Sequence, residues 1–236
     1  MGDYSTARNF FEINMIKDYN SEKFKKITSN EVQFLQRNIP DNYANVLDVM
    51  CGYGRLSNML FKLGYKNIFG VDIGNFNFIP EQKLFKFYNF DFYNWKSPIL
   101  FDYCYSLYNS YNNYQSFLDT INKCNLVLKE DGILIIDIFN KEWRDKLPDF
   151  SHRIINENIY EKVELFRYYD GRNEESVYRI SNSSGIKEFL YSQCVINKEE
   201  LLSLIPNGWH VTITDSRIEK TRDDNQKNIL ILRKKV

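Results

Sequence analysis

Several residue patterns that would point directly to a function are missing from this chain of 236 residues. It has only two histidines, His152 and His210, and neither lies in a carboxylate-rich ligand pattern, so we expect no metal site. Lys plus Arg and Asp plus Glu both number 31, so no overall field draws the chain onto nucleic acid or an anionic membrane. We therefore expect neither of these partners.

Signals for export and for membrane insertion are also missing. The four cysteines are scattered without a Cys-x-x-Cys pair, which is typical of reduced thiols in a cytoplasmic protein. The polar first residues, 1–4, do not resemble a secretory signal. The longest apolar run, from Gly132 to Ile136, has the length of a strand and is too short to cross a bilayer. We expect a cytoplasmic protein.

The most informative segment that is present covers residues 46–55, Val-Leu-Asp-Val-Met-Cys-Gly-Tyr-Gly-Arg. It predicts a buried strand that ends in a glycine turn and opens a helix, because apolar residues then recur at helical spacing from Leu56 to Leu63. Gly64 is the predicted helix stop. Glycines let a ligand approach the backbone closely, and the free amides at a helix start favour electron-rich groups. The segment therefore predicts a nucleotide site.

A second acidic residue supports a ribose-binding role. Asp72 ends the predicted strand Ile68–Asp72 about 20 residues after the turn, where a carboxylate can accept hydrogen bonds from both ribose hydroxyls. A dinucleotide site would usually carry a third glycine in the turn, and here Ser57 stands in that place. This weakens the prediction of a bound pyrophosphate.

The pattern Asp48-x-x-Cys51-Gly52-x-Gly54, followed by Asp72, resembles the class I S-adenosylmethionine-dependent methyltransferases, small-molecule branch. The resemblance runs from about residue 44 to 140. It implies that Asp48 handles the methionine end of the cofactor and Asp72 the ribose. It also implies that Asp91 receives the adenine amino group. The full set of implied cofactor-binding residues is Asp48, Met50, Cys51, Gly52, Gly54, Arg55, Asp72, Ile73, Asp91, Phe92 and Leu107.

The same resemblance identifies residues 101–110 as the fourth strand and the loop after it, and it places this loop under the reactive methyl group. Relatives often have a glycine in the segment that follows, where this chain has Asn112 and Asn113, and asparagine can take the left-handed conformation in place of glycine. The implied acceptor-binding residues are Tyr108, Asn109, Tyr111 and Arg153, and the candidate catalytic residues are Tyr111, Tyr114 and His152. Ring packing for the tyrosines and a surface position for the histidine remain open as alternatives.

Strands alternate with helices from residue 45 to 138, which predicts an α/β fold with a Rossmann-like doubly wound, mostly parallel sheet of seven strands. We expect a helical lid over residues 1–40, a core over 41–148 and 196–236, and an insertion over 149–195. The lid is expected to hold two helices, over residues 7–20 and 21–38, and its candidate aromatic residues, with packing onto the sheet as the alternative, are Tyr4, Phe10, Phe11 and Tyr19. Strand patterns at 160–169, 172–181 and 186–195 predict a three-stranded antiparallel insertion before the last helix, with a tight hairpin at Asp170-Gly171. Asn197 and Glu200 predict the cap of that helix, which is expected to run through Ile205. The insertion is expected to cover the acceptor, to pair subunits as a homodimer, or both.

Three functions remain open. The leading hypothesis is methyl transfer from S-adenosylmethionine to the nitrogen or oxygen of a small polar acceptor, because the prolines typical of nucleic-acid methyltransferases are missing after the fourth strand. A nicotinamide-dependent Rossmann oxidoreductase is a second hypothesis, disfavoured by Ser57. The third is a non-catalytic protein that keeps the cofactor fold, and it is supported by Met50, Tyr53 and Asn113. Of these, Met50 and Tyr53 are expected to crowd the cofactor side of the turn.

Overall fold

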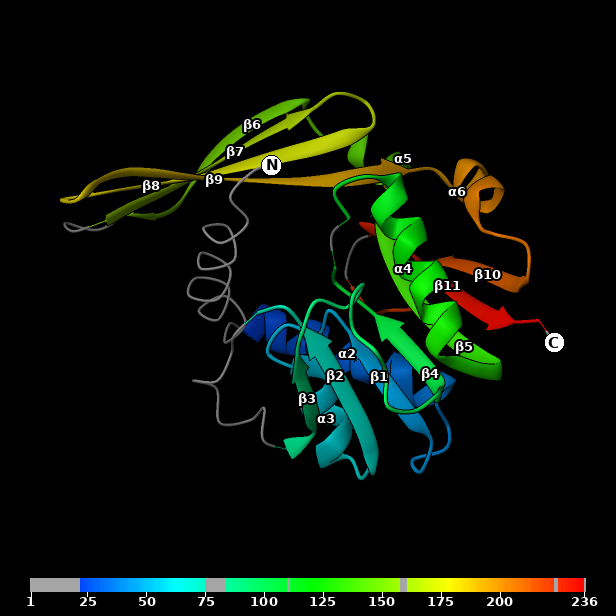
Figure 1. The fold of residues 1–236 in the computed structure, drawn as a ribbon. Coiled ribbons are helices and arrows are strands. Elements are labelled where there is room, and N and C mark those ends of the chain that lie inside the picture. Colours follow the sequence, from blue (N-terminus) through cyan, green and yellow to red (C-terminus); the bar gives the residue numbers. More distant parts are fainter. Residues whose placement is uncertain (1–21, 75–83, 110, 158–160, 223–224, 236) are drawn as a thin grey trace.

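The computed structural model describes residues 22–74, 84–109, 111–157, 161–222 and 225–235. In this part of the chain seven strands form the main sheet, in the order β3, β2, β1, β4, β5, β11, β10 (Figure 1). The first five strands are parallel, and β11 runs antiparallel to both of its neighbours. The predicted doubly wound, mostly parallel sheet is therefore confirmed.

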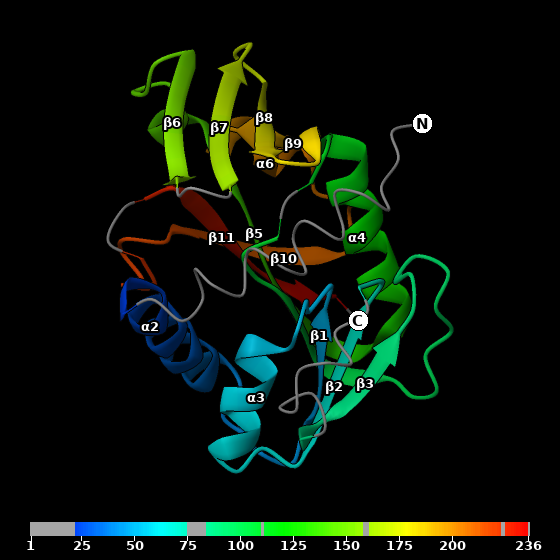
Figure 2. The ribbon, with the colours of Figure 1, turned by 90° about the vertical axis from the view of Figure 1, so that its left-hand side faces the viewer.

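The strands of this sheet are β1 (Asn45–Val49), β2 (Asn67–Asp72), β3 (Lys86–Asn89), β4 (Phe101–Ser106), β5 (Leu128–Asn140), β10 (Trp209–Asp215) and β11 (Lys227–Lys234). Helices α2 (Glu22–Asn38) and α3 (Arg55–Lys62) cover one face, and α4 (Tyr114–Val127) covers the other (Figure 2). Each face has its own apolar core, one of them around Phe34 and Leu60 and the other around Phe117 and Leu134. Both faces are thus buried, as a parallel sheet requires.

Four antiparallel strands, and not three, make up the insertion: β6 (Phe150–Glu157), β7 (Glu161–Tyr169), β8 (Asn173–Asn182) and β9 (Gly185–Ile196). The sequence analysis missed β6. This strand lies at the edge, and its register shifts between Ile154 and Asn156, so its side chains do not keep a strict alternation. At its other end the insertion joins the main sheet, because Val195 and Ile196 of β9 pair in parallel with the end of β5.

Turns and caps within the insertion follow local chemistry. Asp170 Oδ1 accepts hydrogen bonds from the amides of Arg172 and Asn173, and Gly171 has a φ of 92°, which closes the predicted hairpin. The short helices α5 (Lys141–Arg144) and α6 (Lys198–Leu204) flank the insertion. Asn197 accepts from the Glu200 amide at 2.8 Å, so the predicted cap of α6 is confirmed.

Some predictions concern residues that the structure does not describe. The helix expected over residues 7–20 and the lid residues Tyr4, Phe10, Phe11 and Tyr19 lie outside the described ranges. The helix expected over residues 21–38 is present as α2. Within the described ranges, no helix is long and apolar enough to span a membrane.

Candidate active site

The turn after β1 takes the left-handed backbone conformation at three positions. Met50, Gly52 and Gly54 have φ values of 53°, 56° and 78°. A Cβ atom on Gly54 would collide with the ring of Phe85, whereas a Cβ on Gly52 would meet nothing within 4 Å. The Met50 side chain is partly buried and packs against the apolar core, which does not support the expected crowding of the cofactor side. One side of the turn is therefore filled by Phe85, and the backbone at Gly52 is open to an approaching molecule.

Asp72, at the tip of β2, is tied to this turn. Its Oδ2 atom accepts a hydrogen bond from the Gly52 amide at 2.7 Å, and its Oδ1 atom accepts from the Gly74 amide at 2.6 Å. These two bonds orient the carboxylate and tie it to the backbone of the turn and of the segment after β2. Asp72 thus lies at the sheet edge where the sequence predicted a ribose site.

Asp48, near the end of β1, belongs to a buried network of hydroxyl groups. Its Oδ2 atom accepts hydrogen bonds from Ser57 Oγ at 2.7 Å and Tyr105 OH at 2.9 Å. Burial raises the pKa of Asp48 to about 7, although both hydrogen bonds and the charge of Arg55 act in the opposite direction. Ser57, the residue that replaces the third glycine, therefore has a function of its own in holding this carboxyl group.

A cavity of about 450 Å³ lies beyond β2 and β3, and its wall includes Ile73 and Asp91. The other lining residues are Asn89, Phe90 and Asn94. Ile73 and Phe90 are 56% and 51% exposed, so two large apolar side chains face the solvent next to a carboxylate. Asp91 accepts from the Tyr93 amide and from Asn94 Nδ2, and these contacts fix its position. In the described structure no hydrogen bond uses the Phe92 amide.

A cluster of buried charges lies between α2, α3 and the tips of β4 and β5. Glu31 accepts from Arg55 and from Arg222, each at 2.6 Å. Asp137 accepts from Arg222 at 2.9 Å and from Lys227 at 3.2 Å. Burial acts to raise the pKa of Asp137, but the charges of Lys227 and Arg222 outweigh it and lower that pKa. Of these five residues, the sequence analysis identified only Arg55.

Tyr108 stands at the centre of this cluster. Its ring lies 5.2 Å from that of Phe24, and the guanidinium of Arg222 lies 4.9 Å from its centre. Tyr108 has a φ of 67°, in the left-handed region, whereas neither Asn112 nor Asn113, the pair expected to replace glycine in this way, has a positive φ. Asn113 is extended and caps α4. The prediction about Asn113 was wrong because its side chain accepts from the Ser116 amide, which requires the extended backbone of an N-cap.

Three other polar side chains in and beside this loop, those of Asn109, Tyr111 and Tyr114, bond to the protein itself. Asn109 donates to the Val49 carbonyl and to Ser106 Oγ, and these bonds join the tips of β1 and β4. The Tyr111 hydroxyl lies 2.9 Å from Ser106 Oγ, and the residue is only 3% exposed. Tyr114 donates to the Val195 carbonyl at 3.0 Å. Burial raises the pKa of Tyr111 well above its usual value, and its ring packs edge-on against Phe117.

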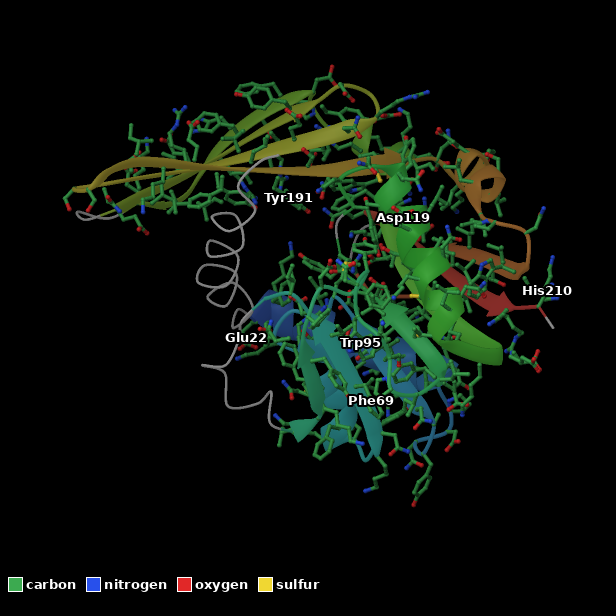
Figure 3. All side chains as sticks on the ribbon, viewed as in Figure 1. Glu22, Phe69, Trp95, Asp119, Tyr191 and His210 are labelled. Atoms are coloured by element: carbon green, nitrogen blue, oxygen red, sulfur yellow. The ribbon has the colours of Figure 1, made fainter. Side chains whose placement is uncertain are left out.

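His152 and Arg153 are neighbours on β6, so their side chains point to opposite faces of the insertion sheet. Arg153 pairs with Leu165 of β7, and cross-strand pairing puts both on the same face of the sheet as Glu174. This inner face contacts α5, because Arg144 of that helix donates to Glu174. Figure 3 shows Tyr191, also on this face, on the side of the insertion sheet that faces the main sheet. His152 stacks on Phe166 on the outer face, 3.0 Å from Glu164. This position is turned away from the strand tips, and the contacts of His152 are with its neighbours on β7.

The cofactor candidates therefore lie along one sheet edge, and the acceptor candidates are dispersed. Leu107 is buried beneath this edge. Cys51 lies in the turn between Met50 and Gly52, and burial raises the pKa of its thiol. Among the described residues, no three His, Cys, Asp or Glu side chains are grouped so that they could hold a metal ion.

Comparison with known proteins finds matches to the fold of this chain. No family model and no curated protein matches the chain. The CcbJ methyltransferase from Streptomyces caelestis has a TM-score of 0.71 at 13% identity, over 89% of this chain and 90% of that chain. A S-adenosylmethionine-dependent methyltransferase from Clostridium acetobutylicum has a TM-score of 0.70 at 13% identity, over 99% of both chains. The sugar N-methyltransferase KedS8 from Streptoalloteichus has a TM-score of 0.68 at 15% identity, over 94% and 92%. The chain has the fold of class I methyltransferases.

Proposed function

We propose that this protein is an S-adenosylmethionine-dependent methyltransferase that acts on the nitrogen or oxygen of a small polar acceptor. The observation that carries the proposal is the placement of Asp48, Asp72 and Asp91 near the carboxyl ends of three adjacent strands, β1, β2 and β3. In an open α/β sheet this edge is where ligands bind. The shared fold with methyltransferases supports the same function.

The residues present fit the proposed cofactor. The open backbone at Gly52 accommodates a close approach, and Asp72 beside it is a carboxylate at a strand tip, the group and position typical of a ribose site. The cavity between Ile73 and Phe90 offers apolar surface to a flat base, with the Asp91 carboxylate within the same wall to accept from an amino group. Each part of an adenosine therefore has a chemically matched group along one continuous edge.

S-Adenosylmethionine supplies, when bound, a methyl group on a positively charged sulfur that a nucleophile displaces in line. The task of the chain is then to bind, to orient and to exclude water, and positioning alone contributes on the order of 7–11 kcal/mol in good intramolecular models. Asn109 and Tyr114, on either side of the predicted acceptor site, are suited to this task because hydrogen bonds fix them to neighbouring strands. Arg153, on the inner face of the insertion, is proposed to contact the acceptor.

A nitrogen acceptor suits these surroundings better than an oxygen acceptor. Burial raises the pKa of Tyr108, Tyr111 and Tyr114, so these phenols stay neutral near neutral pH and do not act as bases. A neutral amine attacks without first losing a proton, whereas a hydroxyl needs a base or a negative charge. We therefore place an amino compound, such as an amino sugar, first among acceptors.

Calorimetry with S-adenosylhomocysteine, followed by methyl transfer to a panel of amines and sugar alcohols, tests the proposal. We expect binding of one molecule per chain and turnover with an amine. Failure to bind S-adenosylmethionine and S-adenosylhomocysteine would overturn the proposal, and quenching of NADH fluorescence would favour an oxidoreductase. Binding without turnover across a broad panel would favour a non-catalytic cofactor-binding protein.

We further propose that the insertion pairs two copies of the chain. Its outer face carries four large apolar side chains that are about half exposed: Phe150, Ile154, Tyr168 and Leu190. Cross-strand pairing puts them on the face opposite to the one that contacts α5. An apolar sheet face of this kind is stabilised when a second copy covers it.

A further inference from the structure

Within the described part of the chain, one buried guanidinium of the charged cluster has donors without a partner. Arg222 Nη2 donates to both Glu31 and Asp137. The Nε and Nη1 atoms of Arg222 are buried and have no hydrogen-bond partner among the residues that the structure describes. The side chain is only 3% exposed, so bulk water does not satisfy these donors. A buried donor without an acceptor costs free energy, so a native site of this kind calls for an acceptor that is bound from outside the chain.

The two carboxylates of the cluster do not neutralise Arg222 by themselves. Glu31 is shared with Arg55, and Asp137 is shared with Lys227. The opposite side of the guanidinium faces the ring of Tyr108, which offers no oxygen lone pair in the plane of the donors. An additional anionic oxygen at Nε or Nη1 would form a charge-assisted hydrogen bond, which is stronger than a neutral one.

The unsatisfied donors of Arg222 lie beside the proposed cofactor site. Arg55, its partner through Glu31, directly follows Gly54 of the turn. Tyr108 directly follows Leu107, and its amide shares the Oδ2 atom of Asp137 with Arg222. Arg222 therefore lies beside the tips of β1 and β4, at the end of the edge opposite to Asp91.

We infer that Arg222 binds the α-carboxylate at the methionine end of the cofactor. This inference rests on the proposed function, because it takes Asp72 and Asp91 as the residues that direct the ribose and the adenine toward β2 and β3. The amino-acid portion of the cofactor then extends along the edge toward β4. A carboxylate there meets the unpaired donors of Arg222, which is carried by the segment between β10 and β11.

The experiment compares two ligands by isothermal titration calorimetry: S-adenosylhomocysteine and its decarboxylated analogue, which lacks only the carboxylate. In the unmodified protein, S-adenosylhomocysteine should bind more tightly than the analogue. Arg222→Gln should raise the Kd for S-adenosylhomocysteine on the order of tenfold or more, because a charge-assisted bond is lost. The Kd for the analogue should change less than twofold.

Two further variants separate direct contact from loss of charge or loss of folding. Glu31→Gln combined with Arg222→Gln restores the total charge of the cluster and removes the buried pair together, so it should fold yet still bind S-adenosylhomocysteine weakly. Arg37→Gln is the matched control, because Arg37 also joins α2 to the segment after β10 through Glu219 but is exposed. It should leave both Kd values unchanged.

The outcomes distinguish this inference from the proposed function. Tight binding of S-adenosylhomocysteine by Arg222→Gln, or by the double variant, would overturn the role of Arg222 and leave the proposed function standing. The same holds if both ligands bind the unmodified protein equally well. If the unmodified protein binds neither ligand, the proposed function and the inference both fail.

Discussion

At the scale of single residues, the sequence identified acids whose position follows from a strand end, and it missed residues that long-range packing brings together. Asp48, Asp72 and Asp91 could be found because each follows an apolar run. Asp137 offered a signal of its own, since it is a lone charge in the apolar run Leu134–Ile138. Its partners Arg222 and Lys227 lie far along the chain, and no local spacing in the sequence predicts that they meet Asp137. Ser57 was considered only as a missing glycine.

Asp72→Ala should weaken the binding of S-adenosylhomocysteine strongly. The change removes the proposed acceptor of the ribose hydroxyls and the bond that orients the Gly52 amide, so we expect a loss of about 1.5–3 kcal/mol per charged hydrogen bond. Tyr111→Phe is the comparison variant, because the Tyr111 hydroxyl is bonded internally to Ser106. Calorimetry on both variants provides the measurement, and equal affinities would contradict the assignment of Asp72.

Asp48→Asn should change how stability depends on pH. The pKa of Asp48 rises from 3.8 to about 7 on folding, so between these pH values the folded chain holds more protons than the unfolded chain. The free energy of unfolding therefore falls as pH rises through this window, and the charged form remains destabilising above it. Asn does not titrate, so the variant lacks the loss of stability that Asp48 causes as pH rises. The free energy of unfolding of the variant, relative to that of the unmodified protein, should therefore increase from pH 4 to pH 7. Urea unfolding at several pH values measures the free energies of unfolding of both proteins. A difference between them that is independent of pH would contradict the raised pKa.

At the scale of elements, the sequence predicted strands and helices well wherever an apolar period met a clear turn signal. The helix after Gly54, the hairpin at Asp170 and the cap at Asn197 are examples. It failed at β6, whose irregular register hides its alternation, and at the loop after β4, where Tyr108 takes the left-handed position. Left-handed tyrosine is uncommon, and here the packing of Tyr108 against Phe24 and its amide bond to Asp137 outweigh the local preference.

Gly54→Ala should destabilise the protein more than Gly52→Ala. Both glycines are left-handed, so an added methyl group costs about 1–2 kcal/mol at either position. At Gly54 the methyl group also collides with the ring of Phe85, which is buried and must move. Chemical denaturation of the two variants measures the difference, and a larger loss of stability at Gly52 would contradict the packing described for this turn.

At the scale of the whole molecule, the fold could be predicted because alternating strands and helices admit few arrangements, whereas the use of the insertion could not. A strand's alternation reveals that one face is buried, but it does not reveal what covers the other face. In the structure the inner face reaches α5 through Glu174 and Arg144, and the outer face leaves Tyr168 and Leu190 exposed.

The proposed pairing of two chains should depend on this outer face. We expect the protein to be a dimer in light scattering after size-exclusion chromatography, and Tyr168→Lys combined with Leu190→Lys to yield monomers, because like charges would face each other across the apolar contact. Lys187→Glu is a suitable control, since Lys187 pairs with Ile180 on the inner face. A protein that is monomeric at every concentration would contradict the pairing.

A crystal structure of the complex with S-adenosylhomocysteine tests the central claim most directly. The account predicts that the adenine lies between Ile73 and Phe90 near Asp91, that Asp72 accepts from the ribose hydroxyls, and that the amino-acid portion extends past Gly52 toward Tyr108. A ligand bound elsewhere on the molecule, with Asp72 and Asp91 in contact only with the protein, would contradict it.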